Sequence, residues 1–216
     1  MEKRIFYIDG ACSQNGDWSG GYGIVELEIS HLQTMTDYIP AYSLNFYAAE
    51  YSENTTNNRE EIKGMIEALK IINDSDKSNF IIYSDSAYVV NMCNNWIWNW
   101  VNNDWKNSKN ITVENVDLIK ELYKYLNKNF SKCQIRKVKG HNGILGNELA
   151  DALASNNIKN FQKLLKDNKV AYDKECYCIN CNKDLKITFY GDKGKCPICG
   201  KGIPLENDYL IKNTYK

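Results

Sequence analysis

Four acidic side chains fall where the strands and helices of the expected fold begin or end. They are Asp9 in the first strand, Glu61 in the first helix, Asp85 at the carboxyl end of the fourth strand, and Asp151 in a later helix. An acid near a helix start most often serves as a cap or dipole partner, so none of the four identifies a site by itself. As a set they supply the hard oxygen ligands that suit Mg²⁺ or Mn²⁺.

Carboxylates drawn from four separate elements would repel one another in the absence of metal. Two divalent ions roughly 3.5–4 Å apart would relieve that repulsion, and such a pair can activate a water on one side of a phosphodiester while stabilising the leaving oxygen on the other. We therefore expect two Mg²⁺ (or Mn²⁺) ions per site, with both stability and activity dependent on the metal.

A second group of chemically active residues lies near the C-terminus, where five of the eight cysteines are concentrated. Cys178-x2-Cys181 is followed by fourteen residues and then by Cys196-x2-Cys199. No secretory signal precedes the first strand, so the cluster predicts metal ligands rather than disulfides. Four thiolates suit a structural Zn²⁺, and the tail resembles a zinc ribbon. Cys176 is an alternative to Cys178, although Cys-x4-Cys is a less usual knuckle.

The pattern of apolar residues predicts an α/β fold that brings the four acids together. Periodicity and turn residues predict the element order βββαβααβα, with strands at 4–11, 24–29, 43–51, 80–83 and 134–138. The first three strands are expected to be antiparallel, and the helix crossovers then give a mixed five-stranded sheet flanked by helices. The first helix follows capping residues at 55–58 and has apolar positions at Ile62, Met65, Ile66, Leu69 and Ile72.

Composition excludes several classes of protein. The chain has 216 residues, 43% of them hydrophobic and 25% charged, with three prolines, which rules out collagen-like, disordered and coiled-coil chains. No apolar run approaches the roughly 18–20 residues of a membrane span, so we expect a soluble, cytoplasmic protein with no membrane partner, and a monomer by default.

Charge is distributed unevenly along the chain. Residues 1–157 carry 15 Lys/Arg and 20 Asp/Glu, whereas residues 158–216 carry 12 and 7. The basic tail could hold an anionic polymer, although a solvated surface explains either sign equally well. We expect three parts: a catalytic domain at 1–157, a helical or flexible linker at 158–174 and a zinc-ribbon-like domain at 175–216.

Six short sequence motifs resemble those of cellular type 1 ribonuclease H and occur in that family's order over about 155 residues. They are IDGA at 8–11, GGYG at 20–23, TTNNREE at 55–61, YSDSAYVV at 83–90, VKGHNG at 138–143 and GNELADALA at 146–154. The resemblance implies that Asp9, Glu61, Asp85 and Asp151 bind two Mg²⁺ and that the enzyme cuts the RNA of an RNA–DNA hybrid. Glu60 competes for the second position, and the spacing from Asn58 and Arg59 favours Glu61.

The resemblance also implies roles for residues outside the carboxylates. His141 falls at the position whose residue assists proton transfer or product release in that family. We expect His31 to be a surface residue. Asn15, Asn57, Asn58 and the backbone at Cys12 would lie along the minor groove of the hybrid, and Thr56 would help to bind a phosphate of the DNA strand. Simple N-capping also explains Thr56 and Asn57.

The tryptophan-rich stretch resembles the protruding handle of bacterial members of the family. The segment at 102–110 keeps only Lys106 and Lys109 as basic residues and contains Asp104. We expect its tryptophans to pack in the core and hybrid binding by the body to be weak. The chain between Gly23 and Thr56 is about a dozen residues longer than in compact members, which predicts a longer second hairpin.

Taken together, these features predict an endoribonuclease that hydrolyses the RNA strand of RNA–DNA hybrids and leaves 5′-phosphate and 3′-hydroxyl ends. The alternatives are a non-catalytic hybrid-binding or adaptor module and a relative that acts on DNA. The ribbon would contact nucleic acid, dock another protein or cap the fold. Its lysines could restore the positive charge that the handle lacks, and they are Lys183, Lys186, Lys193, Lys195 and Lys201.

Overall fold

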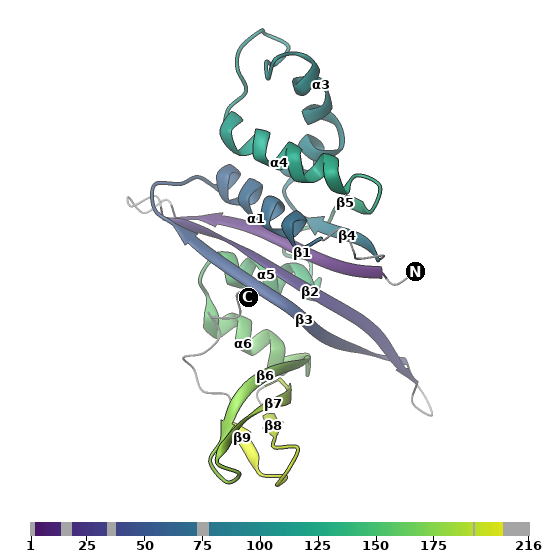
Figure 1. Cartoon of the computed structure of the whole chain (residues 1–216), viewed down its shortest axis with the longest axis vertical. Coiled ribbons are helices and arrows are strands. Elements are labelled where there is room, and N and C mark those ends of the chain that lie inside the picture. Colours follow the sequence, from purple (N-terminus) through teal and green to yellow (C-terminus); the bar gives the residue numbers. More distant parts are fainter. Residues whose placement is uncertain (1–2, 14–18, 34–37, 73–77, 192, 205–216) are drawn as a thin grey trace.

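The protein is built on the predicted mixed sheet (Figure 1). The computed structural model describes residues 3–13, 19–33, 38–72, 78–191 and 193–204. Strands β1 (Lys3–Cys12), β2 (Gly20–Gln33) and β3 (Tyr38–Ser52) pair antiparallel in sequence order. Strand β4 (Asn79–Ser84) runs parallel to β1, and β5 (Cys133–Lys137) runs parallel to β4. The predicted five-stranded sheet and the antiparallel order of its first three strands are confirmed.

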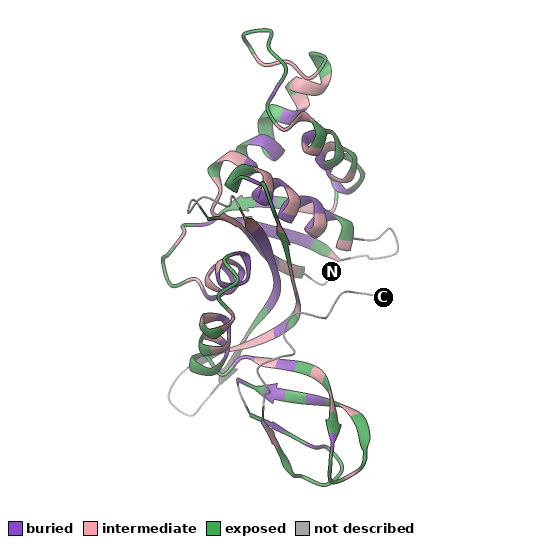
Figure 2. Cartoon of the chain, turned by 90° about the vertical axis from the view of Figure 1, so that its left-hand side faces the viewer, coloured by how far each residue is buried: buried purple, intermediate pink, exposed green. Residues whose placement is uncertain are grey.

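Helices cover both faces of this sheet because its strands alternate apolar residues between two cores (Figure 2). Phe6 and Ile8 face α1 (Asn57–Ile71) and α4 (Val116–Asn129). Tyr7 faces α5 (Leu145–Ala154) and α6 (Ile158–Asp167) on the other side. All the apolar positions predicted for the first helix are buried.

The second hairpin is as long as predicted. Strands β2 and β3 stay paired out to Gln33 and Tyr38, with one register shift between Glu26 and Leu27. Strand β3 begins at Tyr38 rather than at the predicted position 43, since the pairing continues to the end of the hairpin. The expectation for His31 concerns a side chain outside the described part of the chain.

The tryptophan-rich stretch forms a protrusion at one end of the molecule, where α3 is labelled in Figure 1. A π-helical turn, η1 (Met92–Trp96), joins α2 (Ala87–Asn91) to α3 (Ile97–Asn102). Trp98, Trp100 and Trp105 pack against the core, and the rings of Trp98 and Trp105 contact Tyr123 at centroid distances of 5.7 and 5.9 Å. The predicted packing role is confirmed for these three tryptophans, whereas it is wrong for Trp96, which is exposed at the end of the π-helical turn.

The C-terminal part extends the same sheet. Strands β6 (Ala171–Cys178), β7 (Lys183–Tyr190), β8 (Lys193–Lys195) and β9 (Gly202–Pro204) follow β3 through one parallel bridge, Ser43 to Ala171. The sequence left open whether the segment at 158–174 is a helical or a flexible linker. The structure shows that it contains α6.

An apolar cluster crosses from the body into this part of the chain. Phe161 of α6 lies against Tyr47 of β3, with ring centroids 5.5 Å apart. Leu165, Val170, Tyr172, Ile187 and Phe189 join the same cluster. The change in charge at residue 157 therefore does not coincide with a break in the apolar core. None of the described helices is long and apolar enough to cross a membrane.

Candidate active site and cysteine cluster

Four carboxylates from separate parts of the chain meet where β4 ends beside β1. Ligand oxygens of Asp9 in β1, Glu61 in α1 and Asp85 after β4 all lie within 4.8 Å of one another. Asp151 of α5 joins them through a side-chain hydrogen bond with Asp9. The four predicted acids thus lie together.

Strand register and one glycine produce this convergence. Ile8 and Ser84 are partners in the parallel pair β1 and β4, so the residues that follow them, Asp9 and Asp85, lie side by side. A β-carbon on Gly10 would lie 2.4 Å from the backbone nitrogen of Glu61. Only glycine lets β1 pass this close to the first turn of α1, and that approach brings Glu61 to Asp9.

Burial and mutual repulsion disfavour negative charge on these carboxyls. Burial, with the charges of Asp85 and Asp151, raises the pKa of Asp9 to about 8. Burial, with the charges of Asp9 and Asp85, raises the pKa of Glu61 to about 9. Both groups are at least nine-tenths buried, so low exposure and like charge act in the same direction.

Glu60, the competing candidate, points elsewhere. It is fully buried and accepts hydrogen bonds from the Thr55 hydroxyl at 2.5 Å and from Lys63 Nζ at 2.7 Å. Among the described residues it is Glu61 that clusters with Asp9 and Asp85, as predicted from the spacing. Adjacent positions on a helix diverge by about 100°, which separates the two acids.

Residues around Asp85 complete the site, and none of them was assigned a role from the sequence. Asn147 Nδ2 donates to Asp85 Oδ2 at 3.1 Å, and Lys137 Nζ donates to the backbone oxygen of Asp85. A β-carbon on Gly140 would lie 2.4 Å from Asp85 Oδ2. Two features of the sequence could have indicated these contacts. Asn147 lies one helical turn before Asp151, and Lys137 ends a strand predicted to lie in the same sheet as the strand that precedes Asp85.

The predicted accessory residues lie around the cluster rather than in it. His141 is exposed on the loop between β5 and α5, in a left-handed conformation with φ of 48°. Thr56 caps α1 by accepting from the backbone N–H of Arg59, so its capping role is present. Asn57 and Asn58 are exposed in the first turn of that helix.

The remaining predicted substrate contacts are dispersed. The Cys12 thiol contacts the backbone oxygen of Thr55 at 3.3 Å, next to that first turn. In the protrusion, Lys106 is paired with Asp104 at 3.7 Å, and Lys109 is exposed. Asn15 lies outside the described residues.

The donor set fits divalent cations. Glu61 Oε2 is buried and has no hydrogen-bond partner among the described residues. A buried carboxylate oxygen without a partner is costly unless a cation faces it. All the clustered donors are carboxylate oxygens, the ligands that Mg²⁺ and Mn²⁺ prefer.

The cysteine cluster is the second group of possible metal ligands. The sulfurs of Cys178, Cys181, Cys196 and Cys199 lie within 4.8 Å of one another, and two pairs are 3.7 and 3.8 Å apart. Two matching turns hold them: Asn182 N–H donates to the Cys178 carbonyl, and Gly200 N–H donates to the Cys196 carbonyl. Cys176 is half-buried and lies outside the cluster, so the set contains Cys178 rather than its alternative.

Hydrogen bonds favour thiolates in the second knuckle. The backbone N–H of Lys201 and the side chain of Asn180 lower the pKa of Cys199 to about 6. The backbone N–H of Cys199 lowers the pKa of Cys196. Burial and the neighbouring thiols raise the pKa of Cys181 to about 12, so a metal must displace at least one proton.

Comparisons with known proteins agree with this geometry. The RNase H family model matches residues 1–159. A ribonuclease H from Syntrophomonas wolfei is 41% identical over 160 residues, which are 74% of this chain and 98% of that protein. The crystal structure of LC9-RNase H1, a type 1 RNase H with the type 2 active-site motif, superposes with a TM-score of 0.53 at 26% identity over 71% of each chain.

A foamy viral protease-reverse transcriptase in complex with an RNA/DNA hybrid shares the fold. Its TM-score is 0.57 at 23% identity, over 70% of this chain and 19% of that one.

Proposed function

Because this chain belongs to the ribonuclease H family, we propose that it is an endonuclease that hydrolyses the RNA strand of RNA–DNA hybrids. Family membership makes it a nuclease of the hydrolase class. The observation that carries the finer proposal is the meeting of Asp9, Glu61, Asp85 and Asp151 from four separate elements. A non-catalytic adaptor would gain nothing from clustered acids that repel one another.

These four carboxylates would hold two Mg²⁺ or Mn²⁺ ions. The ions, when bound, would supply Lewis-acid activation of the attacking water and stabilise the leaving oxygen, giving 5′-phosphate and 3′-hydroxyl ends. Asn147 and Lys137 would hold Asp85 in place through its side chain and its backbone oxygen. His141, exposed on the loop between β5 and α5, would assist proton transfer or product release.

The hybrid would lie across the first turn of α1. Asn57, Asn58, Asn15 and the backbone at Cys12 would contact the minor groove, and Thr56 would reach a phosphate of the DNA strand while capping its helix. Lys106 and Lys109 would add contacts from the protrusion. The hybrid-bound viral neighbour supports this substrate at the level of the fold alone.

Cys178, Cys181, Cys196 and Cys199 would hold a structural Zn²⁺. Sulfur pairs at 3.7 and 3.8 Å suit four thiolates around one ion, and the N–H groups that point at Cys196 and Cys199 would hold those thiolates in place.

The proposal is tested by cleavage of a labelled RNA–DNA hybrid beside duplex RNA, duplex DNA and single-stranded RNA. Wild type and Asp85→Asn are each assayed with Mg²⁺, with Mn²⁺ and with EDTA. We expect the wild type to cut only the RNA of the hybrid, only with metal, and the variant to be inactive. A hybrid that is bound but survives in every wild-type reaction would favour the adaptor alternative, and cleavage of duplex DNA would favour the relative that acts on DNA.

A further inference from the structure

Helix α6 carries a stripe of lysines on the side that faces away from the core. Phe161 and Leu165 are buried, whereas Lys159, Lys163 and Lys166 are exposed. Their spacing of four and three residues places them within a sector of about 60° of the helix, at 3.6 residues per turn. We call these three residues the α6 lysine stripe.

The stripe is the more basic part of the C-terminal region. Residues 158–170 contain four lysines and one acid, Asp167, which pairs with Lys163 at 2.5 Å. Residues 171–204 contain six lysines and four acids, and four thiolates around one Zn²⁺ would carry a formal charge of about −2. The ribbon, once loaded, is therefore close to neutral, and the positive charge predicted for the tail is concentrated on α6.

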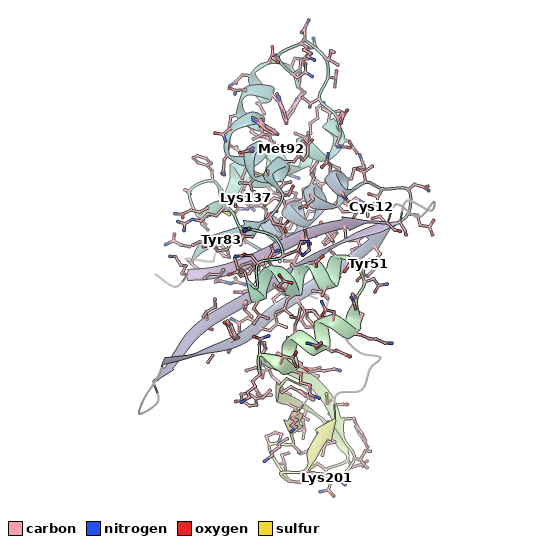
Figure 3. The ribbon with its side chains drawn as sticks, turned by 180° about the vertical axis from the view of Figure 1, so that it is seen from behind. Cys12, Tyr51, Tyr83, Met92, Lys137 and Lys201 are labelled. Atoms are coloured by element: carbon pink, nitrogen blue, oxygen red, sulfur yellow. The ribbon has the colours of Figure 1, made fainter. Side chains whose placement is uncertain are left out.

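The stripe begins beside the surface proposed to hold the hybrid. Tyr51 donates a hydrogen bond to the backbone oxygen of Leu153 at the end of α5, and Cys12 contacts Thr55 just before α1. Figure 3 shows Cys12 and Tyr51 on the same side of the molecule, where α5 ends and α6 begins. Exposed Ser155, Asn156 and Asn157 connect this side to Lys159.

Two of the cations near the proposed hybrid surface lie beside acids. Lys106 is paired with Asp104, and Arg59 is paired with Asp117 at 2.9 Å. Residues 1–157 as a whole carry five more acids than bases. The excess of positive charge in residues 158–170 therefore offers a basic surface to a polyanion that leaves the carboxylate site.

We propose that the α6 lysine stripe binds the phosphate backbone of the nucleic acid that flanks the catalytic site. Lys159 and Lys166 are separated by about 10 Å along the helix axis. That length equals the axial rise of about three phosphates of one strand. Contacts of this kind carry no base specificity, so the stripe would raise affinity for long substrates of any sequence. The proposal rests on the proposed function, and α6 lies almost entirely beyond the family match at residue 159.

Thermal stability and the salt dependence of binding together distinguish a phosphate-binding stripe from a face that only contacts solvent. The like charges of Lys159 and Lys163 at i and i+4 destabilise a helix slightly, and the exposed Lys163–Asp167 pair at i and i+4 stabilises it by a similar amount. Neutralising the stripe should therefore leave thermal stability nearly unchanged. Loss of phosphate contacts should lower the salt dependence of binding by about 0.9 per contact. If the lysines had only a structural role, neutralising them would lower thermal stability and leave the salt dependence of binding unchanged.

The test compares two triple variants that lose equal charge. The first is Lys159→Gln, Lys163→Gln and Lys166→Gln; the second is Lys183→Gln, Lys193→Gln and Lys195→Gln in the ribbon. Binding of a long labelled hybrid is measured between about 50 and 300 mM salt in an Asp85→Asn background. Steady-state cleavage is measured without that substitution, on the long hybrid and on the shortest hybrid that the wild type still cuts.

We expect the α6 variant to lose about 2–3 units of the slope of log K against log salt and to raise KM on the long hybrid. Its kcat, its activity on the shortest hybrid and its melting temperature should match the wild type. A slope equal to the wild type, or an equal loss in the ribbon variant, would overturn the proposal. Failure of the wild type to cut any hybrid would instead count against the proposed function, and the slopes would still report on the stripe.

Discussion

Glu60 and Glu61 are consecutive in α1, yet their carboxylates occupy different environments. Glu61 contributes an oxygen to the cluster with Asp9 and Asp85, whereas Glu60 is held by Thr55 and Lys63. One acid therefore belongs to the candidate metal site and its neighbour to a partly buried ion pair.

This division predicts different defects for two isosteric substitutions. Glu61→Gln should lower activity by at least about 100-fold with a stable fold, because it removes a ligand and a repelling charge together. Glu60→Gln should keep activity but lower the free energy of unfolding by roughly 1–3 kcal/mol, since Lys63 loses its charged partner and keeps only the Ser52 hydroxyl. Cleavage rates and denaturant unfolding distinguish the two, and the reverse assignment of defects would contradict the site.

The raised pKa values of Asp9 and Glu61 should make the free energy of unfolding of the metal-free protein depend on pH. The pKa values of Asp9 and Glu61, about 8 and 9, exceed the ordinary values of 3.8 and 4.5. Between these limits the folded protein keeps protons that the unfolded chain has lost, so the free energy of unfolding falls as pH rises.

The measurement is the melting temperature between pH 5 and pH 9, in EDTA and in Mg²⁺, over the window set by those pKa values. Without metal, stability should fall across the window, and Mg²⁺ should restore most of it at the alkaline end because it replaces the protons. A metal-free protein that became more stable toward pH 9 would refute this account of the cluster.

Gly140 should be required for the position of Asp85. A β-carbon there would lie 2.4 Å from Asp85 Oδ2, so Gly140→Ala must displace the carboxylate. We expect activity to fall by about 10–100-fold, because small displacements of catalytic groups have effects of this size. The melting temperature should change little.

The control for Gly140 lies in the same loop. Gly143 has φ of 72° and nothing within 4 Å of its added β-carbon. Asparagine tolerates this backbone conformation, so Gly143→Asn should keep activity. Equal losses in both variants would indicate a general effect of the loop.

Zinc should stabilise the whole protein rather than the tail alone. Phe189 and Tyr172 of the ribbon strands share an apolar cluster with Tyr47 of β3. Cys199→Ser should therefore lower the temperature of one cooperative melting transition by roughly 6–12 °C for a chain of this length. The matched control is Cys176→Ser, which lies outside the cluster and should change the transition by less than about 1 kcal/mol. Two separate transitions would contradict the shared core.

Local signals predicted most of the fold because they agreed with one another. The apolar positions from Ile62 to Ile72 matched one helical face, and the antiparallel pairing of the first three strands followed from the turn residues between them. The four acids were found from the motifs that resemble the family, and the four clustered cysteines from their spacing. Both searches succeeded because each site uses residues of one chemical type.

Contacts that depend on three-dimensional approach could not be predicted in the same way. The hydrogen bond from Asn147 to Asp85 joins residues 62 positions apart, and the pattern of neither segment indicates it. The π-helical turn at Met92–Trp96 has the same apolar spacing as a continuous helix. The joining of β6 to β3 was missed because the charge change at residue 157 suggested a separate appendage.

The parallel bridge between Ser43 and Ala171 has a consequence for how the chain could be shortened. Strand β3 is 15 residues long and would form the outer edge of the body's sheet if the chain ended at residue 157. Long unprotected edges pair with other molecules. The apolar surface of Leu44 and Tyr47 would also lose Phe161 and Tyr172 as neighbours. A fragment cut at the limit of the family match would therefore expose this apolar surface, and we expect it to self-associate more readily than the full chain.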